Sequence, residues 1–211
     1  MINRIKKNIL ALKPSSTLII NEKSKNLIKK GKKIYQFGFG QSPFPVPEKI
    51  VKALKDNAHK KEYLPIQGLP ELRDSISNYI LKQSGVFYPK ENILITPGSK
   101  EAMLLMHVAF NGEIILPAPS WVSYQPQAQI GQNKVHWLQT FRENNWFPTA
   151  EELEKKIKSI GKKRNLIFIL NSPNNPSGTV CSNLKQIAKV AEKYKLIVLS
   201  DEIYTDLTFN N

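Results

Sequence analysis

Apolar and polar positions follow helical spacing in two stretches before residue 86. KIVKALKDN follows Pro47, and ELRDSISNYILKQ follows Pro70. Proline suits the first turn of a helix, because its missing N–H would have no intrahelical partner there, and Gly85 is placed to end the second helix. The pattern therefore predicts one helix after Pro47 and another from Pro70 to Gly85.

Two strand–helix–strand units are predicted further along the chain. The first joins the apolar runs Ile93–Thr96 and Glu113–Leu116 through a helical stretch, Lys100–Phe110. The second joins Leu166–Leu170 and Leu196–Ser200 through LKQIAKVAEKYK. Short apolar strands connected through helices indicate a largely parallel sheet with helices on both faces, which is an α/β fold.

A further helix is expected directly before the second unit. Thr149 is followed three residues later by Glu152, which is the spacing of a capping box, and EELEKKIKSI continues with helical periodicity. In a capping box each side chain accepts a hydrogen bond from the backbone N–H of the other residue. We expect this helix to begin at Thr149.

The first 46 residues show a weaker pattern, with one helix candidate at Glu22–Lys30. We interpret residues 1–46 as an N-terminal arm or part of a smaller domain, and residues 47–211 as a larger domain. The total length of 211 residues allows one large domain, or one domain and part of another.

Positive charge is concentrated at the start of the chain. Arg4 and nine lysines against Glu22 alone give residues 1–33 nine of the 14 net positive charges. A basic arm can bind an anionic partner, such as nucleic acid or acidic lipid, through counterion release. We favour a solvated surface instead, because the segment lacks the interleaved aromatic residues of single-strand binders, and we expect no nucleic-acid or membrane partner.

Composition excludes several classes of protein. A single cysteine, Cys181, excludes an internal disulfide framework, and His59, His107 and His136 are scattered without metal-ligand spacing. No apolar run approaches the roughly 18 residues that span a bilayer, and the start of the chain has no signal-peptide pattern. We expect a cytoplasmic protein with no metal site.

Candidate binding residues lie where the predicted strands end. Ligands of parallel sheets bind outside the carboxyl ends of the strands, and the segments Thr96–Ser99, Asn171–Gly178 and Asp201 all lie there. Gly98, Ser99 and Lys100 open a helix, whose N-terminus favours an anion such as phosphate, although Pro-Gly-Ser is also an ordinary turn.

Other candidates would suit a planar, charged ring. Asp201 follows a buried strand and requires a partner, for which a protonated ring nitrogen would serve; its ordinary interpretation is a helix N-cap or a surface salt bridge. Trp121 could stack on a ring or pack in the core. Asn174 and Asn175 could hydrogen-bond a phenolic oxygen, although Asn before Pro is also a standard turn former. Tyr204 could present its phenol to the same pocket as Asp201 or pack in the core. Tyr63 could reach an anion or pack.

Five motifs occur together in a specific order: YLPIQGLPELR, ITPGSKEA, PAPSWVSY, NSPNNPSG and SDEIY. This series resembles the class I/II aminotransferases of fold type I, which use pyridoxal 5'-phosphate. The resemblance runs from about Gly40 to residue 211. It implies that residues 47–211 form an incomplete cofactor-binding large domain, with the preceding residues as an N-terminal arm or part of the small domain.

The resemblance also implies roles for individual residues. Gly98, Ser99 and Lys100 correspond to the cup for the cofactor phosphate. Trp121 corresponds to the residue stacked on the pyridine ring, and Asp201 to the acid that pairs with the pyridinium nitrogen.

Four further residues acquire roles in the same way. Asn175 and Tyr204 correspond to the partners of the phenolic oxygen. Gly40 corresponds to a backbone contact to the substrate carboxylate. Tyr63 corresponds to a tyrosine that reaches the phosphate in the neighbouring subunit of the family's homodimer.

Three residues of the family pattern are missing: the lysine that forms the Schiff base, a phosphate-binding arginine and a carboxylate-binding arginine. The lysine that forms the Schiff base follows the Asp-x-x-Tyr segment in the family, and no lysine of this sequence stands in an equivalent context. We therefore expect no catalytic lysine in these 211 residues.

The resemblance leads to a functional expectation. The chain is expected to be the N-terminal half of an amino-acid aminotransferase, which moves an amino group from an amino acid to a 2-oxo acid, and to be inactive alone. One alternative is another fold type I enzyme, a carbon–sulfur lyase or a decarboxylase. A second is a non-catalytic remnant that binds an anionic partner through its basic arm.

Overall fold

The computed structural model describes residues 4–38, 40, 42, 44–161 and 164–208. Contacts group the chain into two units, one of residues 1–16 with 99–211 and one of residues 17–98, and each is described by itself. The division expected at residue 46, between an arm and a large domain, stays a prediction.

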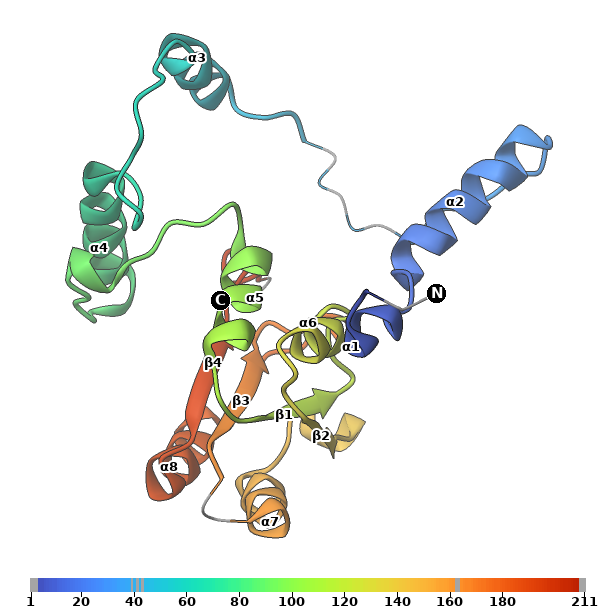
Figure 1. Cartoon of the computed structure of the whole chain (residues 1–211), viewed down its shortest axis with the longest axis vertical. Coiled ribbons are helices and arrows are strands. Elements are labelled where there is room, and N and C mark those ends of the chain that lie inside the picture. The colour runs from blue at the N-terminus through green and yellow to red at the C-terminus, as the bar shows by residue number, and fades with distance from the viewer. Residues whose placement is uncertain (1–3, 39, 41, 43, 162–163, 209–211) are drawn as a thin grey trace. The chain divides into compact units, whose positions relative to one another are not determined.

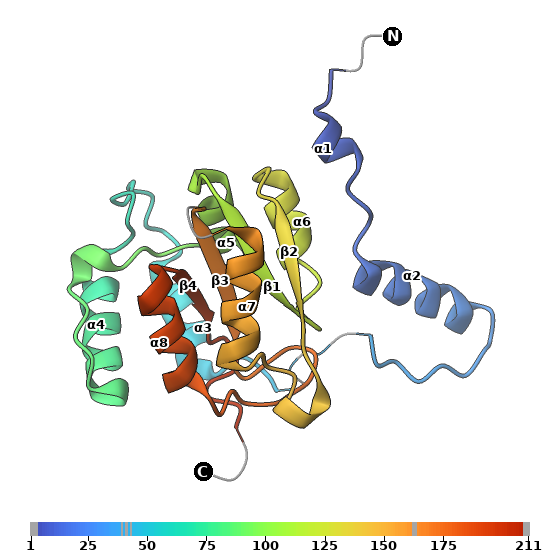
Figure 2. The same ribbon diagram turned by 90° about the horizontal axis from the view of Figure 1, so that it is seen from below.

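The first unit is built on a four-stranded sheet, and Figures 1 and 2 show its strands side by side in the order β2-β1-β3-β4. All three neighbouring pairs are parallel. The strands are β1 (Glu113–Ala118), β2 (Val135–Gln139), β3 (Leu166–Asn171) and β4 (Ile197–Asp201). The sequence predicts β1, β3 and β4, whereas β2 was not predicted.

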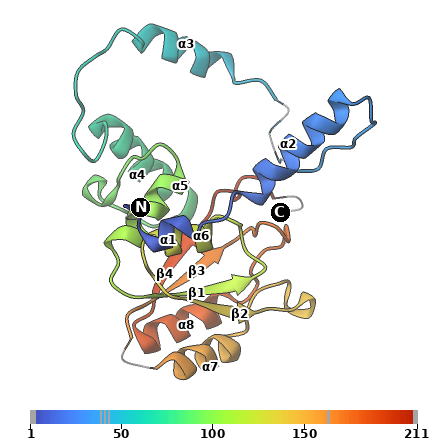
Figure 3. The same cartoon turned by 45° about the vertical axis from the view of Figure 1, so that its right-hand side comes forward.

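Helices cover both faces of this sheet, as predicted. Figure 3 shows α5 (Ser99–Ala109) and α6 (Tyr124–Ile130) on one side of the strands, and α7 (Ala150–Ile160) and α8 (Leu184–Tyr194) on the other. The short helices α1 (Lys7–Leu10) and η2 (Arg142–Asn144) complete the unit, and α1 contacts α6.

The central strand β3 supplies the core of both layers. Its six residues are all buried. Phe168 packs in the cluster that contains Leu153 and Ile187 of α7 and α8, whereas Ile167 and Ile169 pack with the residues of α5 and α6. Successive side chains of a strand point to opposite faces, so a continuous apolar run anchors helices on both sides.

The start of α7 follows the predicted capping box. The Glu152 N–H donates to Thr149 Oγ1 at 3.1 Å, and the Thr149 N–H donates to Glu152 Oε2 at 2.8 Å. The box satisfies two backbone N–H groups that the helix itself leaves unpaired.

The second unit contains α2 (Ser16–Lys29), α3 (Glu48–Asn57), α4 (Pro70–Ser84) and the short η1 (Lys90–Asn92). Helices α3 and α4 confirm the prediction from the proline positions. Gly85 ends α4 with φ of +73°, a left-handed conformation that glycine adopts without a steric penalty.

The strand predicted at Ile93–Thr96 is not formed in the part of the chain that the structure describes. The Ile95 N–H donates to the Gln67 carbonyl at 3.0 Å instead of to a neighbouring strand. Apolar spacing alone cannot make a strand, because a strand also needs a partner for its backbone groups.

No helix among the described residues is long and apolar enough to cross a membrane.

Helices α7 and α8 are joined by an ion cluster around Glu154, which makes stability depend on pH. The Lys193 ammonium, the Tyr194 hydroxyl and the Lys158 ammonium hold the pKa of Glu154 at about 2, below its ordinary value of 4.5. Because the pKa is lowered by folding, the carboxylate stabilises the fold fully above about pH 4.5, and this contribution is lost as the pH falls towards 2.

We predict that Glu154→Gln lowers the free energy of unfolding at pH 7 and that the difference from the wild type disappears between pH 4.5 and 2. Urea unfolding at several pH values measures this. Glu192→Gln is the control, because Glu192 is exposed on α8 and has no ion pair among the described residues. A Glu154→Gln effect that is constant across this pH range would contradict the assignment.

Candidate functional site

The carboxyl ends of β3 and β4 lie at one edge of the sheet. Asn171 and Asp201 are the last residues of these strands and are paired directly across the ladder. The loop that begins after Asn171 and the turn that begins after Asp201 therefore start side by side, as the sequence predicts for ligand-binding loops.

Asp201 is a buried carboxylate with neutral donors. Tyr124 donates its hydroxyl to Asp201 Oδ2 at 2.7 Å, and the Ile203 N–H donates to Oδ1 at 3.3 Å. Both residues are buried, since Tyr124 is 1% exposed and Asp201 is 9% exposed. Burial, and then the hydrogen bond to Asp201, raise the pKa of Tyr124, so its hydroxyl stays protonated as the donor.

No lysine, arginine or histidine within the described ranges forms an ion pair with Asp201. A buried carboxylate is costly unless it is paired or hydrogen-bonded. Asp201 therefore retains the capacity to stabilise a cation placed beside it.

An aromatic pair lies next to this carboxylate. The rings of Trp121 and Tyr124 meet edge to face, with centroids 5.3 Å apart and planes at 80°. Lys100 Nζ lies 5.5 Å from the centroid of the Trp121 ring. The arrangement connects Lys100, Trp121 and Tyr124 to Asp201 by a series of contacts.

The start of α5 and the end of β4 line one hollow of about 310 Å³. Ser99, the first residue of α5, and Asp201 both border it. A helix N-terminus offers unpaired N–H groups to an anion, and Asp201 offers a carboxylate to a cation. The hollow can therefore accept an anion at the start of α5 and a cation beside Asp201.

A second hollow, of about 400 Å³, lies between the loop after β3 and the turn after β4. Asn175 and Tyr204 both border it, and Asn175 Nδ2 donates to the Tyr204 hydroxyl oxygen at 3.0 Å. The two residues predicted to bind one ligand atom thus lie within hydrogen-bond distance of each other.

Comparison with known families agrees with this geometry. The sequence profile of the family described as aminotransferase class I and II matches residues 32–211. The chain belongs to this aminotransferase family. The predicted resemblance is confirmed.

Curated relatives of the chain are named as aminotransferases. The probable aspartate/prephenate aminotransferase of Aquifex aeolicus is 33% identical over 92% of this chain and 50% of its own length. The aspartate aminotransferase of Bacillus sp. (strain YM-2) is 33% identical over 99% of this chain and 53% of its own length. The chain spans about half the length of the curated relatives it matches.

Solved aminotransferases share the fold. Aspartate aminotransferase from Thermus thermophilus, solved with maleate, matches with a TM-score of 0.90 and 28% identity over 98% of this chain and 55% of that chain. The enzyme from Rhizobium meliloti matches with the same TM-score, over 99% of this chain and 53% of that chain. The prediction of an incomplete fold type I large domain is confirmed.

The structure places the predicted site residues of this aminotransferase chain in two groups. Six of them belong to the unit that contains the sheet: Ser99, Lys100, Trp121, Asn175, Asp201 and Tyr204. Gly98, Tyr63 and Gly40 belong to the other unit, and the roles of all nine residues stay predictions. Gly98 has φ of +89°, which supports the expected sharp turn before α5.

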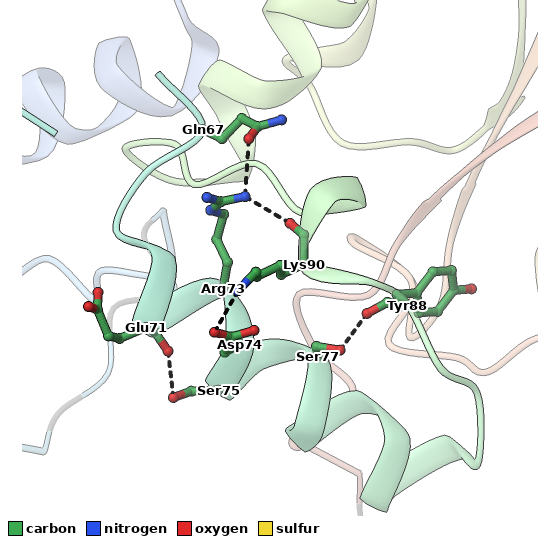
Figure 4. Close-up of polar contacts among 8 residues, drawn as sticks. All are labelled: Gln67, Glu71, Arg73, Asp74, Ser75, Ser77, Tyr88 and Lys90. Carbon is green, nitrogen blue, oxygen red and sulfur yellow. Dashed lines mark hydrogen bonds and ion pairs between the residues drawn. The ribbon is translucent and has the colours of Figure 1, made fainter. Parts of the chain in front are cut away.

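The segment that carries Tyr63 is held by a buried arginine (Figure 4). Arg73 of α4 is 7% exposed, and its Nη1 donates to Gln67 Oε1 at 3.1 Å and to the Lys90 carbonyl at 3.0 Å. Tyr63 itself is fully exposed. The segment is therefore anchored at Gln67, whereas the predicted phosphate-binding phenol is free to contact another molecule.

Gly68 lies at the end of the same segment and has little room. Its φ is +96°, and a Cβ atom there would lie 2.5 Å from Cβ of Ile95. Only glycine fits this close approach without a shift of Ile95.

The sequence analysis included Tyr124 and Asn171 in candidate segments but assigned neither of them a role. Tyr124, the first residue of α6, follows the predicted ring-binding residue Trp121 by three residues, and the two rings are in contact. Asn171 ends a buried strand, where an amide side chain needs partners. Both signals were present in the sequence but had ordinary structural interpretations.

We predict that Tyr124→Phe lowers the free energy of unfolding by about 1–3 kcal/mol, because it removes a buried hydrogen bond to a carboxylate. Urea unfolding measures the loss. Tyr194→Phe is a matched control in the same unit, since its hydroxyl also donates to a carboxylate, Glu154, whose side chain is 23% exposed. Water can replace that bond, so equal losses in the two variants would contradict the account of Tyr124.

Proposed function

We propose that this protein is a pyridoxal-phosphate-dependent amino-acid aminotransferase and that the described chain supplies most of its cofactor-binding residues. Family membership supports the reaction class. The observation that carries the proposal is the placement at one sheet edge of a helix N-terminus, an Asn–Tyr pair and a buried carboxylate that has no cationic partner among the described residues.

The chemistry of these groups fits the cofactor. A protonated ring nitrogen is the cation that Asp201 lacks, and the N-terminus of α5 with Ser99 suits a phosphate. The Asn175 amide can donate a hydrogen bond to a phenolic oxygen, and the Tyr204 hydroxyl can donate another. Trp121 offers an aromatic face for stacking.

Asp201 and Tyr124 perform the main electrostatic task in this proposal. The Asp201 carboxylate keeps the ring nitrogen protonated, and the Tyr124 hydroxyl holds Oδ2 so that the carboxylate stays oriented. When bound, the cofactor supplies an electron sink for the carbanion that forms at the α-carbon of the substrate.

The remaining roles concern substrate and assembly. We propose amino-acid and 2-oxo-acid substrates, the classes on which aminotransferases act, with the Gly40 backbone contacting the substrate carboxylate. The full-length form is proposed to be a cytoplasmic homodimer in which Tyr63 reaches the phosphate in the partner subunit. Its complete exposure supports this role.

The 211-residue chain is proposed to bind the cofactor without catalysing amino-group transfer. Among the described residues, no lysine borders either hollow. A nucleophilic amine is required for covalent attachment of the cofactor and for the proton transfer that follows.

Binding of pyridoxal phosphate to the chain tests the proposal directly. We predict that Asp201→Asn weakens binding about tenfold or more, because it removes the charge that pairs with the ring nitrogen. Quenching of tryptophan fluorescence during titration measures the dissociation constant. Asp206→Asn, an exposed site in the same turn region, is the control and should change the constant by less than about twofold.

Equal affinities of the wild type and Asp201→Asn would contradict the proposed site, and so would the absence of any saturable binding by the wild type.

A further inference from the structure

Asn171 joins two loops of the site through its side chain. Its Oδ1 accepts a hydrogen bond from the backbone N–H of Asn175 at 2.7 Å. Its Nδ2 donates to the backbone carbonyl of Asp201 at 2.9 Å. Asn171 is only 6% exposed, so water has little access to either bond.

The two bonds use both ends of one planar amide. Only a side chain that carries a donor and an acceptor at this spacing can satisfy an N–H on one loop and a carbonyl on the other. Aspartate would retain only the acceptor and alanine neither group. Because the position is buried, loss of the Asn171 acceptor leaves the Asn175 N–H without this partner, whereas the Asp201 carbonyl still accepts from the Ser172 N–H at 3.2 Å.

Asn171 thereby connects the residue proposed to bind the ring nitrogen of the cofactor with the residue proposed to bind its phenolic oxygen. Asp201 presents its carboxylate from the strand end that Asn171 contacts. Asn175 is held at its backbone by Asn171 and at its side chain by Tyr204. The series Asp201, Asn171, Asn175 and Tyr204 is continuous through three hydrogen bonds.

We propose that Asn171 is a positioning residue that fixes the distance between the Asp201 carboxylate and the Asn175 amide. The functional role of this link rests on the proposed function, in which the Asp201 carboxylate binds the ring nitrogen and the Asn175 amide binds the phenolic oxygen. The linkage itself is a property of the chain and can be tested without the cofactor.

Amide hydrogen exchange of the 15N-labelled chain tests the linkage. In the wild type the Asn175 amide should be protected, and Asn171→Ala should accelerate its exchange about tenfold. The Asn174 amide is an internal control, because it donates to the Thr179 carbonyl at 2.9 Å and does not depend on Asn171. Asn171→Asp retains the acceptor and should restore protection of Asn175.

A matched variant separates positioning from general stability. Asn133 is also buried, at 7% exposed, and its Nδ2 donates to the carbonyls of Phe110 and Gly112. Asn133→Ala removes a comparable buried amide, but should leave the Asn175 exchange rate unchanged within about twofold. The same titration with pyridoxal phosphate should give about tenfold weaker binding for Asn171→Ala and no change for Asn133→Ala.

The outcomes distinguish the two proposals. An unprotected Asn175 amide in the wild type, or equal acceleration by Asn133→Ala and Asn171→Ala, would overturn the positioning role even if the chain binds pyridoxal phosphate. Selective acceleration in Asn171→Ala would support the linkage, and a wild-type chain that then failed to bind pyridoxal phosphate would overturn the proposed function and the meaning we assign to the linkage.

Discussion

The site depends on the burial of β3 on both faces. All six residues of this strand are buried, and the five apolar residues from Leu166 to Leu170 alternate between the cluster under α7 and α8 and the cluster under α5 and α6. A slip of one residue would move every side chain of the strand to the opposite face of the sheet, where it would have to pack against the other pair of helices. The register that places Asn171 opposite Asp201 is therefore fixed by apolar packing, and the polar contacts of the site follow from it.

Local signals in the sequence predicted the elements whose causes are local. The Thr149–Glu152 cap, the helix from Pro70 to Gly85 and the continuous apolar run of β3 all formed as expected. Helix α6 was missed because its seven residues include Pro126 and three glutamines, which hide the helical spacing. The predicted strand at Ile93–Thr96 was wrong because pairing depends on residues that are distant in the sequence.

The candidate site could be predicted only in part, because topology places the ends of strands together but does not specify the partners of their side chains. Residues at strand ends, such as Asp201 and Asn175, could be placed near one another from topology alone. The partners of their side chains could not, because Tyr124 lies 77 positions before Asp201 in the sequence and Asn171 lies 30 positions before it. Periodicity does not specify contacts over such separations.

One edge of the sheet exposes apolar side chains. Strand β4 pairs with β3 on one side, and its apolar residues Ile197 and Val198 are 51% and 37% exposed. Exposed apolar surface of this kind is typical of a place where another protein surface packs. The central claim is that four segments of this unit bind one ligand: the start of α5, the loop after β1, the loop after β3 and the turn after β4.

Chemical-shift mapping of the 15N-labelled chain during titration with pyridoxal phosphate tests that claim most directly. The account predicts saturable shifts, with one dissociation constant, at the amides of Ser99, Trp121, Asn175, Asp201 and Tyr204. Shifts confined to the basic residues 4–33, or different dissociation constants for the four segments, would contradict it.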